Sequence, residues 1–118
     1  MEKIRQIVFF KEYFHEFYNA QNIKVRNKID EVLFMMTVIE RVPRKFLDHL
    51  TGTEGIYEIR VEFAGNIFRI FCCFDEGRLV VLFNGFQKKT HKTPNAEIEK
   101  AEKLKNEYFK SKQSHEKQ

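Results

Sequence analysis

Residues 56–86 decide the fold, and they read IYEIRVEFAGNIFRIFCCFDEGRLVVLFNGF. Residues 56–63 alternate between apolar and charged side chains, and residues 67–74 divide in the same way between two faces, which is the pattern of β-strands. The short sequences AGN and DEGR, which are typical of tight turns, follow these two runs. Residues 79–86 are almost continuously apolar, which indicates a central strand covered on both faces. This stretch therefore predicts an antiparallel meander of three strands.

The segment before the meander predicts a strand and two helices. Residues 4–10 are apolar and β-branched enough for a first strand. Apolar side chains then recur at steps of three and four over residues 11–20, and again over a longer stretch after Asn22, a residue suited to cap a helix. Residues 41–55 lose this periodicity and contain Pro43 and two glycines, so we predict a connection there.

The end of the chain predicts a third helix. Thr93 and Pro94 form a typical helix start, with Thr93 as the N-cap and Pro94 at the first helical position. We expect a flexible polar tail over residues 111–118, after a single domain of residues 1–110. The order β-α-α-β-β-β-α predicts an α+β domain whose first strand pairs at an edge of the antiparallel meander. We expect the helices to pack on one face of the sheet and to leave the other face concave and partly open.

The composition is that of a globular domain with a mild bias toward acidic partners. The chain has 118 residues, of which 42% are hydrophobic and 32% charged, and its formal net charge is +4. Cys72 and Cys73 point to opposite faces of a strand, and the four histidines are scattered without metal-ligand spacing, so we predict neither a metal nor a cofactor. The first residues lack the apolar core of a signal peptide, and no apolar run approaches the ~20 residues that span a bilayer. We therefore predict a cytoplasmic protein without a membrane partner.

Positive charge gathers at the end of the last predicted strand. Lys88, Lys89 and Lys92 follow Phe86 there, and they either form a solvated turn or track a nucleic-acid backbone. Phe86 belongs either to the core or to a platform on which a base stacks. His91 is either an exposed turn residue or a general acid or base, because an imidazole is suited to proton transfer near neutral pH.

Two arginines lie within the predicted strands. Arg60 and Arg69 have apolar neighbours, where a guanidinium group is costly unless it has a partner. One interpretation is a salt bridge across the sheet, with Glu58 or Glu62 as the partner. The other is that each guanidinium grips a phosphate with two hydrogen bonds. The connection over residues 41–55 adds a second basic segment, which contains Arg44, Lys45 and His49.

Such residues suit the metal-independent cleavage of RNA. A base or a positioned cation activates the ribose 2′-hydroxyl, cations stabilise the pentacovalent phosphorane, and an acid or solvent protonates the leaving 5′-oxygen. DNA lacks the 2′-hydroxyl and does not react in this way.

Three motifs in this sequence resemble the RelE/ParE toxin superfamily, and within it the HigB-like toxins related to phage-derived proteins. Residues 55–60, GIYEIR, are similar to that group's "YELR", and residues 66–70, NIFRI, are similar to its "YRI". Residues 85–94, GFQKKTHKTP, are similar to its "GFxKKTxKTP". The order and spacing of the three motifs agree with the family, and the resemblance spans roughly residues 4–108.

The resemblance implies the toxin of a type II toxin–antitoxin system. Such toxins are ribosome-dependent mRNA endoribonucleases (mRNA interferases): they enter the ribosomal A site, cut mRNA by 2′-hydroxyl attack without a metal, and so inhibit translation. The implied partners are mRNA and a cognate antitoxin with a helix-turn-helix DNA-binding domain, encoded beside the toxin. The complex typically represses its own promoter.

The resemblance also implies roles for individual residues. Arg60 corresponds to the arginine that stabilises the transition state, Arg69 to the second strand arginine, and Lys88 and Lys89 to a basic position near the scissile phosphate. Many relatives place a tyrosine after that position as the general base, whereas this sequence has none between Phe86 and Pro94. We therefore expect catalytic roles for Arg60, Arg69, Lys88, Lys89 and His91, and RNA or phosphate binding by Phe86, Lys92, Lys45, Arg44 and His49.

Two other functions stay open at the level of sequence. ParE-type relatives share the fold and inhibit DNA gyrase without cutting RNA, although the basic cluster at the strand end argues mildly against this function. A degenerate toxin retained as a regulatory binding module is the third hypothesis.

Overall fold

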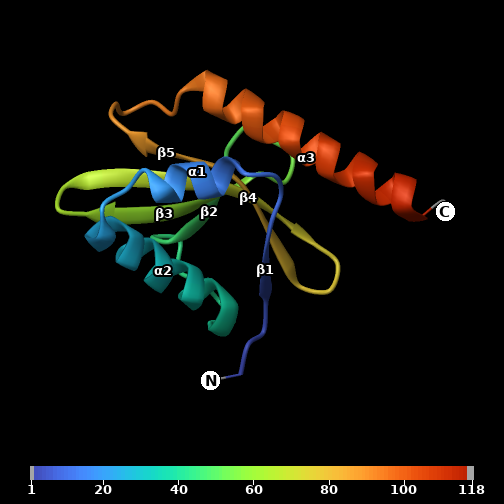
Figure 1. Ribbon diagram of the computed structural model, residues 1–118, viewed down its shortest axis with the longest axis horizontal. Helices are drawn as coiled ribbons and strands as arrows, with labels where there is room; N and C mark the ends of the chain where they lie inside the picture. Colours follow the sequence, from blue (N-terminus) through green and yellow to red (C-terminus); the bar gives the residue numbers. More distant parts are fainter. Residues whose placement is uncertain (1, 117–118) are drawn as a thin grey trace.

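The computed structural model describes residues 2–116 and contains a five-stranded mixed sheet with three helices (Figure 1). The elements follow one another as β1 (Gln6–Phe9), α1 (Tyr13–Asn19), α2 (Ile23–Val38), β2 (Leu47–His49), β3 (Tyr57–Phe63), β4 (Asn66–Asp75), β5 (Leu79–Lys88) and α3 (Asn95–Glu116). The fold class is α+β, as the sequence predicts.

The sheet has the strand order β1-β5-β4-β3-β2, with β1 parallel to β5 and all other neighbours antiparallel. The meander of β3, β4 and β5 and the position of β1 at its edge confirm the prediction. Ala64 and Gly65 form the first turn with φ angles of 51° and 80°. Two consecutive residues with positive φ are what a two-residue hairpin needs to match the twist of its strands. This short turn fixes which residues of β3 and β4 face each other.

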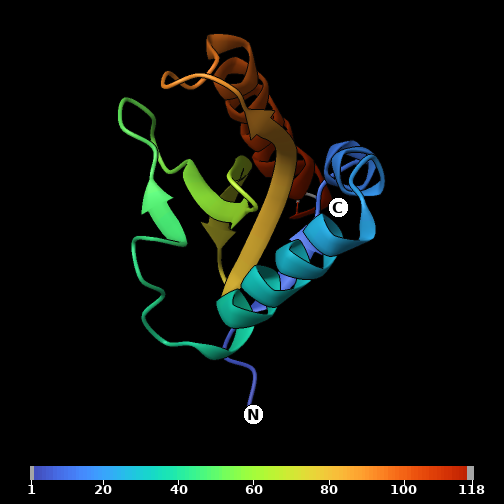
Figure 2. The ribbon, with the colours of Figure 1, turned by 90° about the vertical axis from the view of Figure 1, so that its left-hand side faces the viewer.

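The sheet has one strand that the sequence did not predict. β2 lies within residues 41–55, which we expected to form only a connection, and it pairs with β3 at the edge opposite β1. Figure 2 shows β2 on the side of the sheet away from α1 and α2. Three residues are too few to display an alternating pattern, which explains why periodicity missed this strand.

One face of the sheet packs against α1 and α2. The cluster includes Phe17 of α1, Ile29 and Met36 of α2, and five residues of β4 and β5, which are Phe68, Ile70, Cys72, Val80 and Leu82. Asn22 caps α2 as predicted, because its side-chain oxygen accepts a hydrogen bond of 2.9 Å from the backbone N–H of Val25. The ring of Phe17 lies so close to Gly85 that a Cβ atom there would sit 2.4 Å from the ring. β5 therefore needs a glycine at this position for α1 to pack.

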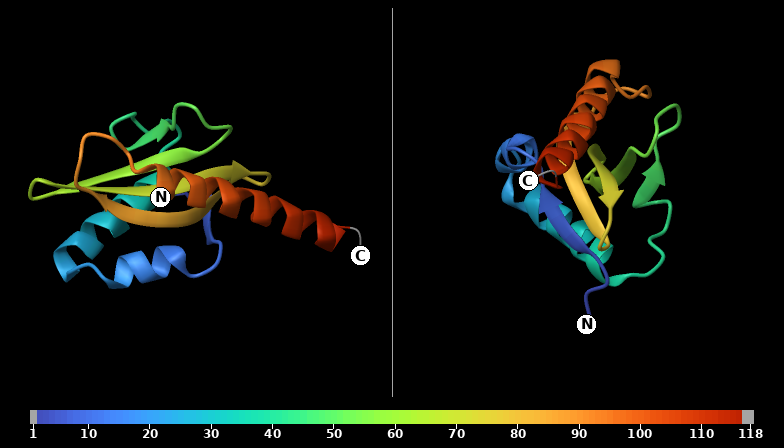
Figure 3. Two further views of the ribbon diagram at one scale, coloured as in Figure 1. Left: turned by 90° about the horizontal axis from the view of Figure 1, so that it is seen from above. Right: turned by 90° about the vertical axis from the view of Figure 1, so that its right-hand side faces the viewer.

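The opposite face is not open, which corrects the prediction that all helices pack on one side. A second core cluster joins Phe71 and Cys73 of β4 and Phe83 of β5 to Ala101 and Leu104 of α3. These strand residues are odd-numbered, so they point away from α1 and α2. Figure 3 shows α3 on one side of the strands and α1 with α2 on the other, and α3 extends past the sheet at its C-terminal end. The expected cover of β5 on both faces is confirmed.

The two ends of α3 differ in detail from the prediction. The backbone N–H of Ile98 donates to the carbonyl of Pro94 at 3.3 Å, so the helix begins one residue later than a Thr93 N-cap implies. α3 also continues to Glu116, through most of the stretch expected to form a flexible tail, whereas residues 117–118 lie outside the described residues. None of the helices in residues 2–116 is both long and apolar enough to span a membrane.

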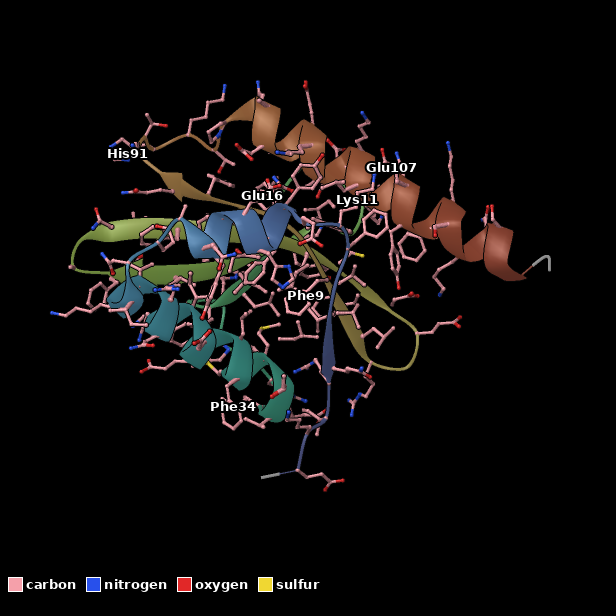
Figure 4. The ribbon with its side chains drawn as sticks, in the orientation of Figure 1. Phe9, Lys11, Glu16, Phe34, His91 and Glu107 are labelled. Atoms are coloured by element: carbon pink, nitrogen blue, oxygen red, sulfur yellow. The ribbon has the colours of Figure 1, made fainter. Side chains whose placement is uncertain are left out.

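Polar contacts fasten α3 to the rest of the domain. Tyr108 donates its hydroxyl to Asp75 Oδ2 at 2.7 Å, and Lys112 Nζ lies 2.8 Å from the same oxygen. Burial raises the pKa of Asp75, but the hydrogen bonds from Lys112 and Tyr108 outweigh this effect and hold the pKa below its usual range. Near the middle of the helix, Lys11 forms an ion pair with Glu107, and Figure 4 shows these two side chains next to each other. Lys11 thereby ties the β1–α1 junction to α3.

Candidate functional site

The face of the sheet that α3 covers is apolar in one half and charged in the other. Beneath α3 it is apolar, whereas β3 carries Glu58, Arg60 and Glu62 on this face. In the sheet register Arg60 lies opposite Arg69 of β4, and Arg69 lies opposite Phe86 of β5. The three neighbouring strands therefore bring the two sequence-predicted arginines side by side beyond the apolar patch.

Carboxylates hold both arginines. Glu58 stands between them, with Oε1 at 3.2 Å from Arg60 Nη2 and Oε2 at 3.0 Å from Arg69 Nε. The second contact is an ion pair only, because its atoms are not aligned for a hydrogen bond. Asp48 of β2 adds a contact of 3.4 Å to Arg60 Nη2 and another of 3.4 Å to Arg44 Nε. The salt-bridge interpretation with Glu58 is thus confirmed in geometry, and a charged network Arg44–Asp48–Arg60–Glu58–Arg69 results.

The two strand arginines differ in access. The side chain of Arg69 is 9% exposed and that of Arg60 is 29% exposed. Burial lowers the pKa of Arg69, while the charge of Glu58 opposes this shift and keeps the guanidinium stable as a cation. Arg60 Nε is buried without a hydrogen-bond partner among residues 2–116, so its donors are not saturated. Because 29% of its side chain is exposed, Arg60 is able to meet a ligand directly, although not through the buried Nε, whereas Arg69 is almost fully buried.

A second basic surface lies where β5 ends. Lys88, Lys89 and His91 line an open groove together with the β3–β4 turn at Gly65 and Asn66. Lys88 is half-buried and lies two residues beyond Phe86, hence on the same face of the sheet as Arg69. Figure 4 shows His91 on the loop between β5 and α3. His91, Lys89 and the neighbouring Lys92 are exposed.

Several candidate residues do not belong to this site. Phe86 is 9% exposed, and its ring packs edge-on against Phe71 at 5.3 Å between centroids, so it is a core residue and not a platform for a base. His49 lies on the other face of the sheet from Asp48, because neighbours on a strand point in opposite directions. Its ring contacts Tyr57, which packs in the cluster under α1 and α2. Neither ring is available to RNA at the arginine cluster.

The basic segment before β2 divides in a similar way. Arg44 joins the charged network through Asp48, as described above. Lys45 instead stands over the ring of its neighbour Phe46, with Nζ 5.6 Å from the ring centroid. Of the second basic segment, only Arg44 has a contact that ties it to the strand arginines.

The member of the charged network that the sequence did not predict is Asp48. Glu58 was foreseen as an arginine partner, since it lies two residues before Arg60 and so on the same face of one strand. Asp48 comes from β2, which no sequence pattern revealed. Within residues 2–116 no three His, Cys, Asp or Glu side chains are grouped in a way that would hold a metal ion.

A comparison with protein families shows the family to which this chain belongs. The model described as Phage derived protein Gp49-like (DUF891) matches residues 16–106. The chain belongs to this family. It is a family of RelE/HigB-like toxins, and the matched range contains the whole charged network and the lysine groove. The comparison with curated proteins finds no match.

Proposed function

We propose that this Gp49-like protein is the toxin of a type II toxin–antitoxin system, and that it cuts mRNA on the ribosome by metal-independent 2′-hydroxyl attack. One observation carries the proposal: Arg60, Arg69 and Lys88 lie on the same face of three adjacent strands, next to the apolar patch that α3 covers. Membership of a toxin family supports it.

In the proposed reaction the cations stabilise charge on the phosphate. The 2′-oxygen bonds to phosphorus while the bond to the 5′-oxygen breaks, which leaves a cyclic phosphate and a free 5′-hydroxyl. Negative charge grows on the non-bridging oxygens in the transition state, where preorganised donors act most strongly. Arg60 offers its exposed guanidinium edge to these oxygens, and Lys88 approaches from the groove. Arg69 keeps Glu58 neutralised and so holds Arg60 in place.

The proposed reaction also requires two proton transfers. The 2′-hydroxyl must lose a proton, and the leaving 5′-oxygen must gain one. His91 lines the same groove as Lys88 and is the imidazole closest in sequence to the lysines. We assign it to one of these transfers, with solvent as the partner for the other.

The proposed partners are mRNA in the ribosomal A site and an antitoxin with a helix-turn-helix domain. The neighbouring reading frame should encode that antitoxin, and its co-expression should restore growth. Sequencing the region beside the gene and co-expressing the neighbour test this part of the proposal.

The decisive experiment is cleavage of an mRNA programmed on purified ribosomes. Arg60→Ala and Lys88→Ala should each reduce the cleavage rate by roughly 10²–10³, the usual cost of removing one preorganised donor at a developing oxyanion. Arg78→Ala and Lys24→Ala are matched controls, because both side chains are exposed and lie outside the cluster. Wild-type rates in both test variants would disprove the site. Intact mRNA together with a DNA-damage response would favour gyrase inhibition instead.

A further inference from the structure

The carboxylate of Asp48 bridges two arginines as a phosphate would. Its Oδ1 lies 3.4 Å from Arg44 Nε and its Oδ2 lies 3.4 Å from Arg60 Nη2. A phosphodiester group also carries one negative charge on two terminal oxygens, and arginine binds carboxylates and phosphates through the same donors. Asp48 thus occupies donors that a phosphate needs.

Asp48 and Glu58 are held very differently. Glu58 is 7% exposed, lies within the seven-residue strand β3, and contacts Arg60 and Arg69 at 3.2 and 3.0 Å. Asp48 has a side chain that is 27% exposed and lies on the three-residue edge strand β2. Its contacts with the two arginines are both 3.4 Å long, and its only shorter bond is local, a hydrogen bond of 3.0 Å that Oδ1 accepts from the backbone N–H of the next residue, His49. Removing one member of a buried ion pair is costly, whereas a partly exposed pair with long contacts contributes little. We therefore expect an incoming anion to displace Asp48 and to leave Glu58 in place.

We propose that Asp48 is a resident counter-anion of the Arg44–Arg60 pair, and that a phosphodiester group of the RNA substrate replaces it when RNA binds. This inference rests on the proposed function of the site. It gives β2 a role, which is to hold a competing carboxylate against the arginine that faces the substrate. Glu58 is by contrast a positioning residue that keeps Arg60 oriented in both states.

The exchange of Asp48 for a phosphate favours an RNA strand that carries more than one phosphate. A single phosphate gains little, because it only replaces one anion by another at the same two arginines. A strand that also places a phosphate in the groove of Lys88 and Lys89 gains additional contacts that Asp48 does not offset. Asp48 therefore lowers affinity for small anions and short fragments relative to a continuous RNA strand.

The test measures binding of a fluorescent 2′-O-methyl RNA oligonucleotide, which lacks the hydroxyl needed for cleavage, by anisotropy at low salt. Asp48→Asn should bind about two- to fivefold more tightly than wild type, the range expected when a weak competing ion pair is removed. The slope of log K against log salt should stay close to that of wild type, because the same arginines meet phosphate in both proteins. Asp30→Asn is the matched control: it changes the net charge equally, but Asp30 is exposed on α2, where it accepts from Tyr18. It should change affinity less than twofold.

Two further variants separate the proposal from simpler explanations. In an Arg44→Ala/Arg60→Ala background, Asp48→Asn should have no effect beyond that of Asp30→Asn, because both competed donors are gone. Asp48→Ala should tighten binding as Asp48→Asn does, which excludes a special role of the new amide. The proposal is overturned if Asp48→Asn binds no more tightly than Asp30→Asn, or if the gain persists without Arg44 and Arg60.

The results also distinguish the counter-anion proposal from the proposed ribonuclease activity. If wild type fails to cut ribosome-bound mRNA but Asp48→Asn still tightens binding, the nuclease proposal fails and the counter-anion remains. If wild type cuts mRNA and Asp48→Asn leaves oligonucleotide affinity unchanged, the counter-anion proposal fails and the nuclease remains.

Discussion

Replacing Gly85 by alanine should destabilise the domain by about 3 kcal/mol. An added Cβ would lie 2.4 Å from Phe17 Cδ2 and 2.8 Å from both Cε2 and Cγ of the same ring. Carbon atoms pack best at about 3.5–4.0 Å, so the ring would have to retreat by roughly 1 Å. Phe17 is 8% exposed and packs against Phe14 and Phe68. An overpacked core costs typically 1–3 kcal/mol, and a buried ring that cannot swing aside belongs at the upper end.

Urea unfolding and thermal melting measure this loss, and the melting temperature should fall by roughly 10 °C. Alanine is otherwise the better strand residue by about 0.5–1 kcal/mol, so the sign of the effect depends on the clash alone. In a Phe17→Ala background the obstructing ring is absent, and Gly85→Ala should then be neutral or stabilise by up to about 1 kcal/mol. An equal loss in both backgrounds would refute the argument, as would a Gly85→Ala protein as stable as wild type.

Three further predictions concern the N-cap residue Asn22, the carboxylate of Asp75 that binds α3, and the thiol of Cys73. Asn22→Ala should lower the free energy of unfolding by about 1 kcal/mol in urea, because it removes the N-cap of α2; no change would contradict the cap. The pKa of Asp75 is depressed because hydrogen bonds from Lys112 and Tyr108 outweigh burial, so its stabilising contribution exists above the unfolded pKa of about 3.9 and disappears as pH falls through the folded value. Melting temperatures from pH 7 to 2 should therefore fall less steeply for Asp75→Asn, and parallel curves would refute this. Burial raises the pKa of Cys73 to about 11, so iodoacetamide at pH 8 should label it only after unfolding, as mass spectrometry would show.

Much of the sheet was predictable because its turns are short. A two-residue turn at Ala64 and Gly65 leaves no freedom in the register of β3 against β4, so Arg60 must face Arg69. The period of two then puts both arginines and Glu58 on one face. The arginine cluster follows from the sequence by this reasoning alone, without knowledge of how the helices pack.

The side on which α3 packs was not predictable from α3 itself. Its apolar stripe, with Ala101 and Leu104, shows that one side of the helix is buried but not against which face of the sheet. The information lay in β4 and β5, where Phe71 and Phe83 also needed cover on the face away from α1 and α2. The continuous apolar run of β5 already indicated this, and it conflicts with an open second face.

The charged network was only half predictable for a related reason. Glu58 and Arg60 share a strand, so their proximity is a local property of the sequence. Asp48 reaches Arg60 only because β2 pairs with β3, and three residues carry too little pattern to reveal that pairing. Phe86 could not be assigned from the sequence for a different reason. A phenylalanine suits both a core and a stacking platform, and only its packing against Phe71 shows which of the two it is.

The pairing of β1 with β5 delays the completion of the sheet during synthesis. Residues 6–9 take residues 79–82 as their partners, so one of the first segments made waits for one of the last. At ~5–20 residues per second the wait is roughly 4–15 s, and contacts this distant in sequence are slow to form. The core beneath α1 also requires Gly85 and its neighbours on β5. A message cut anywhere before the codons for β5 therefore yields a chain without a partner for its first strand and without the basic groove at the end of its last.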